Sequence, residues 1–98
     1  MTDSTFTQTC PVGSSKIAMV VHPGEDYHFY RQDKDGYWSH KDGMNKVKRY
    51  DAKGRLIINP QSAARDYRPN GSFLNYKDFC NFYCVPRRHT IKLNRWNF

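Results

Sequence analysis

The residues best suited to chemistry lie in one stretch, 26–43, with the sequence DYHFYRQDKDGYWSHKDG. It holds two histidines, His28 and His40, among aromatic and cationic side chains. Imidazole can exchange a proton near neutral pH, aromatic rings offer stacking surfaces, and Arg or Lys can bind phosphate groups. The stretch therefore predicts a ligand site or an active site, and packing in a core is the alternative role for the same residues.

The backbone pattern of this stretch is typical of a β-hairpin. Two strand-forming segments flank DKDG, in which Gly36 can take the positive φ that a tight turn needs. A three-residue loop at 34–36 places Tyr30 opposite His40, and one face then holds His28, Tyr30, Gln32, Trp38 and His40. A loop shifted by one residue moves His40 to the opposite face, because a one-residue slip reverses every side chain. The sequence is compatible with both registers.

The elements around this hairpin predict an α+β domain with a small antiparallel sheet of four to six strands and two short helices. The apolar run KIAMVV at 16–21 predicts a buried central strand. A second hairpin is expected from 47–50 and 55–58, which flank DAKG. The tail after Pro86 alternates basic and apolar residues, which favours a last edge strand.

Two helices are expected in the C-terminal half of a single domain, 1–98. Asn59 and Pro60 suit the first turn of a helix that extends to Tyr67. Asn75 is a candidate N-cap for a second helix, YKDFCNFYC, with its aromatic side chains turned inward. Residues 1–15 are rich in Thr, Ser and Gly and predict a flexible lead-in.

Charge is distributed unevenly along the chain. The formal net charge is +7, with a net −2 over residues 1–45 and a net +9 over residues 46–98. A basic half favours anionic partners: a nucleotide-like ligand, nucleic acid or an acidic protein. A solvated surface without a partner is the alternative. The short chain can build only a modest core, which favours a homo-oligomer.

The three cysteines, Cys10, Cys80 and Cys84, bear on the compartment and on metal binding. An odd number of cysteines and no apolar leader segment favour a reducing, cytoplasmic location. The CxxxC spacing of Cys80 and Cys84 differs from a zinc knuckle, so neither a metal nor a cofactor is expected. No apolar run approaches the roughly 20 residues that span a membrane, so no membrane partner is expected.

Two resemblances bear on function, and together they cover roughly 16–86. The segments KIAMVV, DYHFYR and DGYWSHK are similar to the sheet in the second half of papain-like Cys–His hydrolases. That resemblance implies catalytic positions at His28 and His40 in a half-domain that lacks the nucleophilic Cys. DYHFYRQ, DGYWSHK and FCNFYCVP also resemble small uncharacterised bacterial and viral proteins. Viral proteins that sequester host nucleotide signals are similar in size and character, and they act in the host cytoplasm.

These observations favour a binding protein without catalytic activity. The expected ligand is anionic, and a small nucleotide-like molecule is preferred. The predicted ligand-binding residues are His28, Tyr30, Arg31, Trp38, His40, Lys41 and Arg65. The alternatives are a remnant of a papain-like hydrolase, and a basic inhibitor module that binds protein or nucleic acid.

Overall fold

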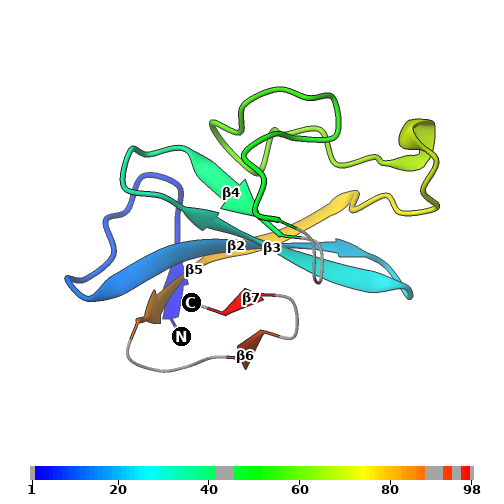
Figure 1. Ribbon diagram of the computed structural model, residues 1–98. Helices are drawn as coiled ribbons and strands as arrows, with labels where there is room; N and C mark the ends of the chain where they lie inside the picture. The colour runs from blue at the N-terminus through cyan, green and yellow to red at the C-terminus, as the bar shows by residue number, and fades with distance from the viewer. Residues whose placement is uncertain (1, 42–45, 88–91, 94–95, 98) are drawn as a thin grey trace.

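The structure, a computed structural model, describes residues 2–41, 46–87, 92–93 and 96–97. Its elements are β1 (Thr2–Ser4), β2 (Ser14–His22), β3 (Asp26–Gln32), β4 (Trp38–His40), the 3-10 turn η1 (Arg68–Asn70), β5 (Asp78–Pro86), β6 (Lys92–Leu93) and β7 (Trp96–Asn97). The first five strands form one antiparallel sheet in the order β1-β5-β2-β3-β4, and β6 pairs with β7 in a separate ladder (Figure 1). The described residues thus form a mostly β structure, and they offer no candidate for a helical membrane span.

The centre of the sheet agrees with the sequence prediction. The apolar run 16–21 lies in β2, which is the middle strand and pairs with β5 on one side and β3 on the other. In the β3–β4 hairpin Tyr30 lies opposite His40, which confirms the three-residue loop. Gly36 in that loop has φ of 89°, a value that residues with a side chain rarely adopt.

One face of the sheet carries the main hydrophobic cluster. Side chains of β2, β3, β4 and β5 alternate across the sheet, so Ala18, Tyr30, Trp38 and Phe82 point to the same side. The long segment 46–77 crosses over this face (Figure 1) and adds Ile57 and Tyr76 among other side chains to the core. The loop, rather than a helix layer, completes the hydrophobic core.

The second predicted helix is wrong: its residues form β5. The pairing with β2 shifts between Met19 and Val20, which face Asn81 and Phe79, so Cys80 is the extra residue of a β-bulge. The bulge brings Phe79 and Phe82 to the same face, with ring centroids 4.9 Å apart. A spacing of three residues that indicates a helix therefore arises here from a strand with a bulge.

The first predicted helix is also wrong, although its start signal is real. The Asn59 side chain accepts a hydrogen bond from the Gln61 amide, and the Asn59 carbonyl accepts one from the Ser62 amide. A single turn forms there, as expected of a capping Asn. The backbone then leaves the helical path because the amide of Ala64 donates to the Asp51 carboxylate and its carbonyl accepts from Ala52.

Three other predictions need correction. The second hairpin is reduced to an isolated bridge between Tyr50 and Leu56. The tail contributes no strand to the main sheet among its described residues, β6 and β7, and the rest of the predicted strand lies outside them. The N-terminal residues are not a simple lead-in, because β1 pairs with β5 and residues 14 and 15 already belong to β2.

Candidate functional site

Four of the predicted ligand-binding side chains lie together, but in the interior. His28, Tyr30, Trp38 and His40 are at most 2% exposed. His40 Nε2 lies 2.8 Å from the Tyr50 carbonyl, to which it donates, because a carbonyl can only accept. His40 Nδ1 then accepts from His28 Nε2, also at 2.8 Å. The two imidazoles thus tie β3 and β4 to the covering loop, and no ligand reaches the rings in this arrangement.

The three predicted cations are dispersed. Arg31 lies on β3 with its side chain on the sheet face opposite to these rings. Lys41 directly follows β4 and is half-buried. Arg65 lies in the covering loop, where its guanidinium donates to the Pro60 carbonyl and lies 5.7 Å from the Phe79 ring. The structure therefore does not bring the seven predicted residues into one site.

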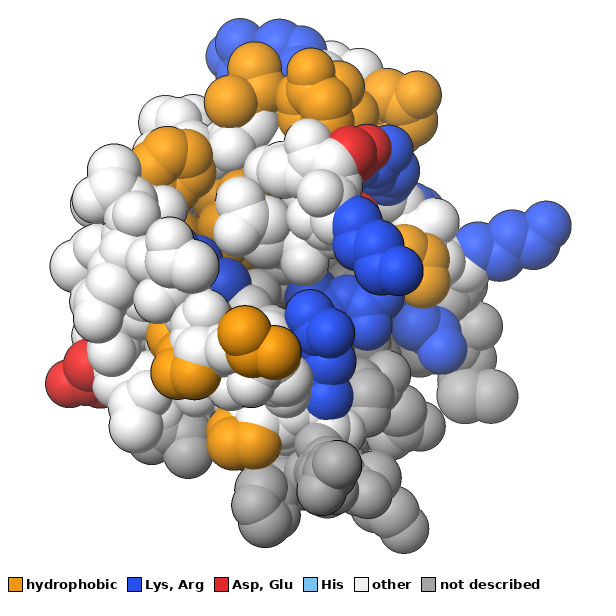
Figure 2. Space-filling model, turned by 90° about the vertical axis from the view of Figure 1, so that its left-hand side faces the viewer, with side chains coloured by type: hydrophobic (Ala, Val, Ile, Leu, Met, Phe, Trp, Pro, Cys, Tyr) orange, Lys and Arg blue, Asp and Glu red, His pale blue; other side chains and the backbone are white. Residues whose placement is uncertain are grey.

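A different site lies at one end of the sheet, beside the segment 5–13, here called the N-terminal arm. It is a cleft of about 660 Å³, here called the basic cleft, between the arm, the first residues of β2 and the end of β3. Its lining residues are Phe6, Thr7, Gln8, Thr9, Cys10, Ser14, Ser15, Lys16, Arg31, Gln32, Asp33, Lys34 and Arg87. Figure 2 shows Lys and Arg side chains gathered beside a hollow on the face that carries the arm.

The arm is fastened to the sheet at three points. The side chains of Lys16, Phe82 and Cys84 share the core face of the sheet, under the arm. Lys16 Nζ donates to the Phe6 carbonyl at 2.9 Å, and the Phe6 ring lies 5.9 Å from that of Phe82. The third point is a disulfide between Cys10 and Cys84. The residues that form one wall of the cleft are thereby held over β2 and β5.

Positive charge dominates the lining of the basic cleft. Four cations, Lys16, Arg31, Lys34 and Arg87, line it with a single carboxylate, Asp33, whose Oδ1 lies 3.9 Å from Arg31 Nε. Asp33 is itself shared, since its Oδ1 accepts from the Ser39 hydroxyl at 3.0 Å and its Oδ2 lies 3.5 Å from Arg49 Nε. One carboxylate cannot neutralise this set, so the cleft is suited to an anion.

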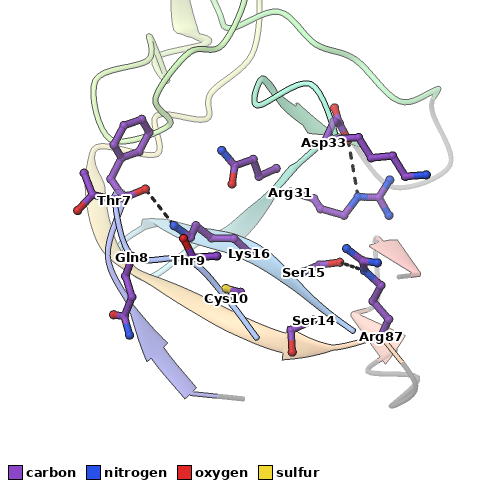
Figure 3. Close-up of a pocket in the computed structure, with 13 residues that line it drawn as sticks. Thr7, Gln8, Thr9, Cys10, Ser14, Ser15, Lys16, Arg31, Asp33 and Arg87 are labelled. Carbon is purple, nitrogen blue, oxygen red and sulfur yellow. Dashed lines mark hydrogen bonds and ion pairs between the residues drawn. The ribbon is translucent and has the colours of Figure 1, made fainter. Parts of the chain in front are cut away.

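The four cations differ in how the structure positions them. Lys16 is buried, and burial lowers its pKa from the usual value. Arg87 is held by a hydrogen bond of 3.0 Å from its Nε to the Ser15 hydroxyl. Figure 3 shows Lys16 directed towards the arm, and Arg31 and Arg87 on the other side of the cleft. Lys16 and Arg31 thus point to opposite faces of the sheet, and Arg31 and Arg87 are the two cations drawn on the same side of the cleft.

The neutral part of the lining supplies hydrogen-bond donors and acceptors. Thr, Ser and Gln side chains make up six of the lining residues, and Phe6 is the aromatic ring among them, 37% exposed. Hydroxyl and amide groups can bind the hydroxyls of a sugar, and an exposed ring can stack on a base. The cleft therefore offers both kinds of contact that an organic phosphate needs.

Sequence reasoning found Arg31 but missed the rest of this site. Two signals were present: a lysine at the head of the most apolar strand, Lys16, and an arginine directly after β5, Arg87. The arm was missed because its composition is that of a flexible segment. Its position depends on the Cys10–Cys84 pairing, which joins residues 74 positions apart.

The thiols do not form a hydrolase-like site with the histidines. Cys10 and Cys84 are joined in the disulfide, and Cys80 is exposed on β5, whereas His28 and His40 are buried. Within the described ranges, no three His, Cys, Asp or Glu side chains are grouped as metal ligands would be. The described residues therefore place no cysteine thiol beside a histidine.

Comparison with known proteins gives one partial match. A stretch of 49 residues is 57% identical to insoluble matrix shell protein 1 of Ruditapes philippinarum. The match covers 50% of this chain and 33% of that protein, so the chain spans about a third of its relative. No family model matches, and no solved structure matches significantly.

Proposed function

We propose that the chain is a binding protein without catalytic activity that holds a small organic phosphate in the basic cleft. One observation carries the proposal: four cations and a single, shared carboxylate line a cleft of about 660 Å³. Arg31 and Arg87 are the two groups best suited to the phosphate, because guanidinium can donate two parallel hydrogen bonds to it.

A nucleotide-like molecule is the preferred ligand within this class. Phe6 lies in the lining of the same cleft as the cations and is partly exposed, so it can stack on a base. The hydroxyls of the arm and of β2 can bind a ribose. The proposed ligand position is at the end of the sheet, away from the buried rings of β3 and β4.

Isothermal titration with inorganic phosphate, sulfate, ADP and adenosine tests the proposal and separates the sources of affinity. We expect ADP to bind more tightly than phosphate or sulfate, and uncharged adenosine to bind most weakly. Arg31→Gln and Arg87→Gln should each weaken ADP binding about tenfold, since a hydrogen bond to a charged group contributes roughly 1.5 kcal/mol or more. If neither ADP nor phosphate binds at millimolar concentration, the proposal is wrong.

Arg68→Gln is the matched control. Arg68 is exposed, forms an ion pair with Asp66 and lies in η1, outside the cleft. Its loss lowers the net charge by the same amount as the cleft variants. Equal losses of ADP affinity in Arg68→Gln and Arg31→Gln would mean that binding follows net charge and not the cleft.

A second proposal concerns location, and the shell matrix relative favours it. The relative is named as a protein of an insoluble shell matrix. A disulfide between Cys10 and Cys84 also fits an oxidising compartment, in contrast to the cytoplasmic location predicted from the cysteine count. We propose that the chain acts outside the cytoplasm, as part of a secreted protein.

Alkylation of the protein taken from its natural source, denatured without a reductant, distinguishes the two locations. A secreted protein should take up one alkyl group, on Cys80, because the other two cysteines are joined. Uptake on all three cysteines would support the cytoplasmic location instead. The homo-oligomer expected from the small core stays a prediction, for which the mass of the native protein is the direct measurement.

A further inference from the structure

The disulfide between Cys10 and Cys84 holds the arm that forms one wall of the basic cleft. Cys84 lies in β5, where it faces Thr2 of β1 on one side and Lys16 of β2 on the other. Cys10 lies in the arm and contributes to the lining of the cleft. The bond therefore joins the wall of the cleft to the strand beneath it.

The other contacts of the arm are few. Of its nine residues, 5–13, only Cys10 is half-buried, and the others are exposed. Apart from the disulfide, the contacts of the arm with other described residues include the Lys16–Phe6 hydrogen bond, the Phe6–Phe82 ring contact and the hydrogen bond from the Arg87 amide to the Gly13 carbonyl. At its two ends, the Ser4 hydroxyl donates to the Thr5 carbonyl and the Ser14 amide to the Pro11 carbonyl. An exposed segment with so little buried area cannot offset the conformational entropy of holding nine residues in place.

We propose that the disulfide completes the binding site, so that the protein binds its anionic ligand in the oxidised form and loses most of its affinity when Cys10 and Cys84 are reduced. This inference rests on the proposed function of the basic cleft. It predicts that the chain becomes competent to bind on transfer from a reducing to an oxidising compartment. Reduction frees the wall without breaking the pairing of β2 with β3 and β5.

The chemistry of the step is thiol–disulfide exchange with a dithiol reductant. One thiolate of the reductant attacks Cys10 Sγ, the Cys10–Cys84 bond breaks, and Cys84 leaves as a thiolate that takes up a proton. The second thiol of the reductant then displaces Cys10 and forms a cyclic disulfide, so two electrons pass to the protein. Cys10 is the sulfur that is attacked because it lines the cleft, whereas Cys84 is 5% exposed.

Formation of the disulfide and binding of the ligand are reciprocally coupled. If oxidation raises the affinity for a ligand, the ligand must stabilise the disulfide by the same factor. A bound ligand also covers the route to Cys10. Reduction by dithiothreitol should therefore be slower and less complete in the presence of ADP than in its absence.

The experiment uses the full chain with Cys80→Ser, which leaves Cys10 and Cys84 as its two cysteines. ¹⁵N relaxation in the oxidised form and after dithiothreitol reports on the arm and the sheet in the same sample. We expect order parameters of 5–13 to fall below about 0.6 on reduction, while those of β2 stay near about 0.85. Titration with ADP should show a loss of affinity of at least about tenfold, since an arm in place for a tenth of the time weakens binding by that factor.

The possible outcomes separate this inference from the proposed function. Equal ADP affinity in the two forms, or an arm that stays ordered after reduction, overturns the inference and leaves the proposed function intact. No binding of ADP or phosphate to the oxidised form overturns the proposed function and this inference with it. If dithiothreitol also unfolds β2, ADP affinity is measured in Cys10→Ser instead, because this substitution removes the disulfide but nearly keeps the size of the side chain. The measurement counts only if the sheet of the variant is ordered. Full ADP affinity in that variant overturns the inference.

Discussion

The carboxylate of Asp51 should decide the stability of the covering loop. Its side chain is 4% exposed and accepts hydrogen bonds from three backbone amides, those of Lys53, Arg55 and Ala64. Two of these amides belong to the turn that follows Asp51, and the third belongs to the segment beyond Ile57. One side chain thus fixes both ends of the loop that places Ile57 in the core.

The cost of losing this carboxylate can be worked from those bonds. In Asp51→Ala all three amides lose their partner, at about 1 kcal/mol for each amide that water can partly reach. We expect a loss of about 3 kcal/mol in the free energy of unfolding. In Asp51→Asn one oxygen still serves Lys53 and Arg55, but an NH₂ group now meets the Ala64 amide, so the loss should be about 1–2 kcal/mol. Unfolding in urea at pH 7 measures both, with Asp78→Asn, an exposed carboxyl on β5, as the control.

The dependence on pH gives a second test. Burial alone raises the pKa of Asp51, but the hydrogen bonds from the Arg55, Ala64 and Lys53 amides and the charge of Arg55 outweigh it and hold the pKa below its usual value. A carboxyl with a depressed pKa stabilises the fold above its unfolded pKa of about 3.9, and loses that contribution as the pH falls through the folded value. The stability difference between the wild type and Asp51→Asn should be constant from pH 5 to 8 and shrink below about pH 4. A difference that is unchanged at pH 2, or absent at pH 7, would refute the reasoning.

Other substitutions test the core, the hairpin and the disulfide. Trp38→Ala should cost about 3–5 kcal/mol in urea unfolding, because the ring is fully buried against Phe82; a cost under 1 kcal/mol would contradict this packing. His40→Phe leaves the Tyr50 carbonyl without its donor and should lower the free energy of unfolding by about 1–3 kcal/mol; ADP affinity should not change, unless the buried rings form the ligand site after all. Gly36→Ala should cost more than about 1 kcal/mol because of the positive φ, measured by thermal unfolding, and an unchanged midpoint would argue against the three-residue loop. Cys10→Ser removes the cross-link between two residues 74 positions apart and so gives the unfolded chain more conformational freedom. The loop-entropy relation predicts a loss of about 4 kcal/mol in the free energy of unfolding, measured by thermal unfolding with Cys80→Ser as the control.

The central strand and the hairpin were predictable because their signals are local. The apolar run of β2 and the turn at Gly36 indicate both elements without any knowledge of distant residues, although the sequence left two hairpin registers open. β5 could not be predicted from local signals. Its bulge at Cys80 brings Phe79 and Phe82 to one face, and the same spacing is expected of a helix. Only the pairing with β2, which is far away in the chain, distinguishes a bulged strand from a helix here.

The candidate site was harder to predict than the fold. Sequence reasoning placed the ligand on His28 and His40, since two imidazoles on one hairpin face are a strong local pattern. The structure uses that face as its core, where the rings satisfy each other. The basic cleft instead depends on side chains from three separate segments, and on a disulfide that no spacing rule connects.

The strand order has a consequence for synthesis on the ribosome. β1 pairs only with β5 within the main sheet, and β2 also needs β5 along one edge. A nascent chain can close the β2–β3–β4 meander early, but one edge of β2 stays unpaired until Pro86 has emerged. Chains dominated by such distant pairings fold slowly, and an open apolar edge invites association between molecules. A release from the ribosome before β5 is complete would therefore yield a sheet with an unpaired central strand, which makes the last third of the chain decisive for whether the rest folds or aggregates.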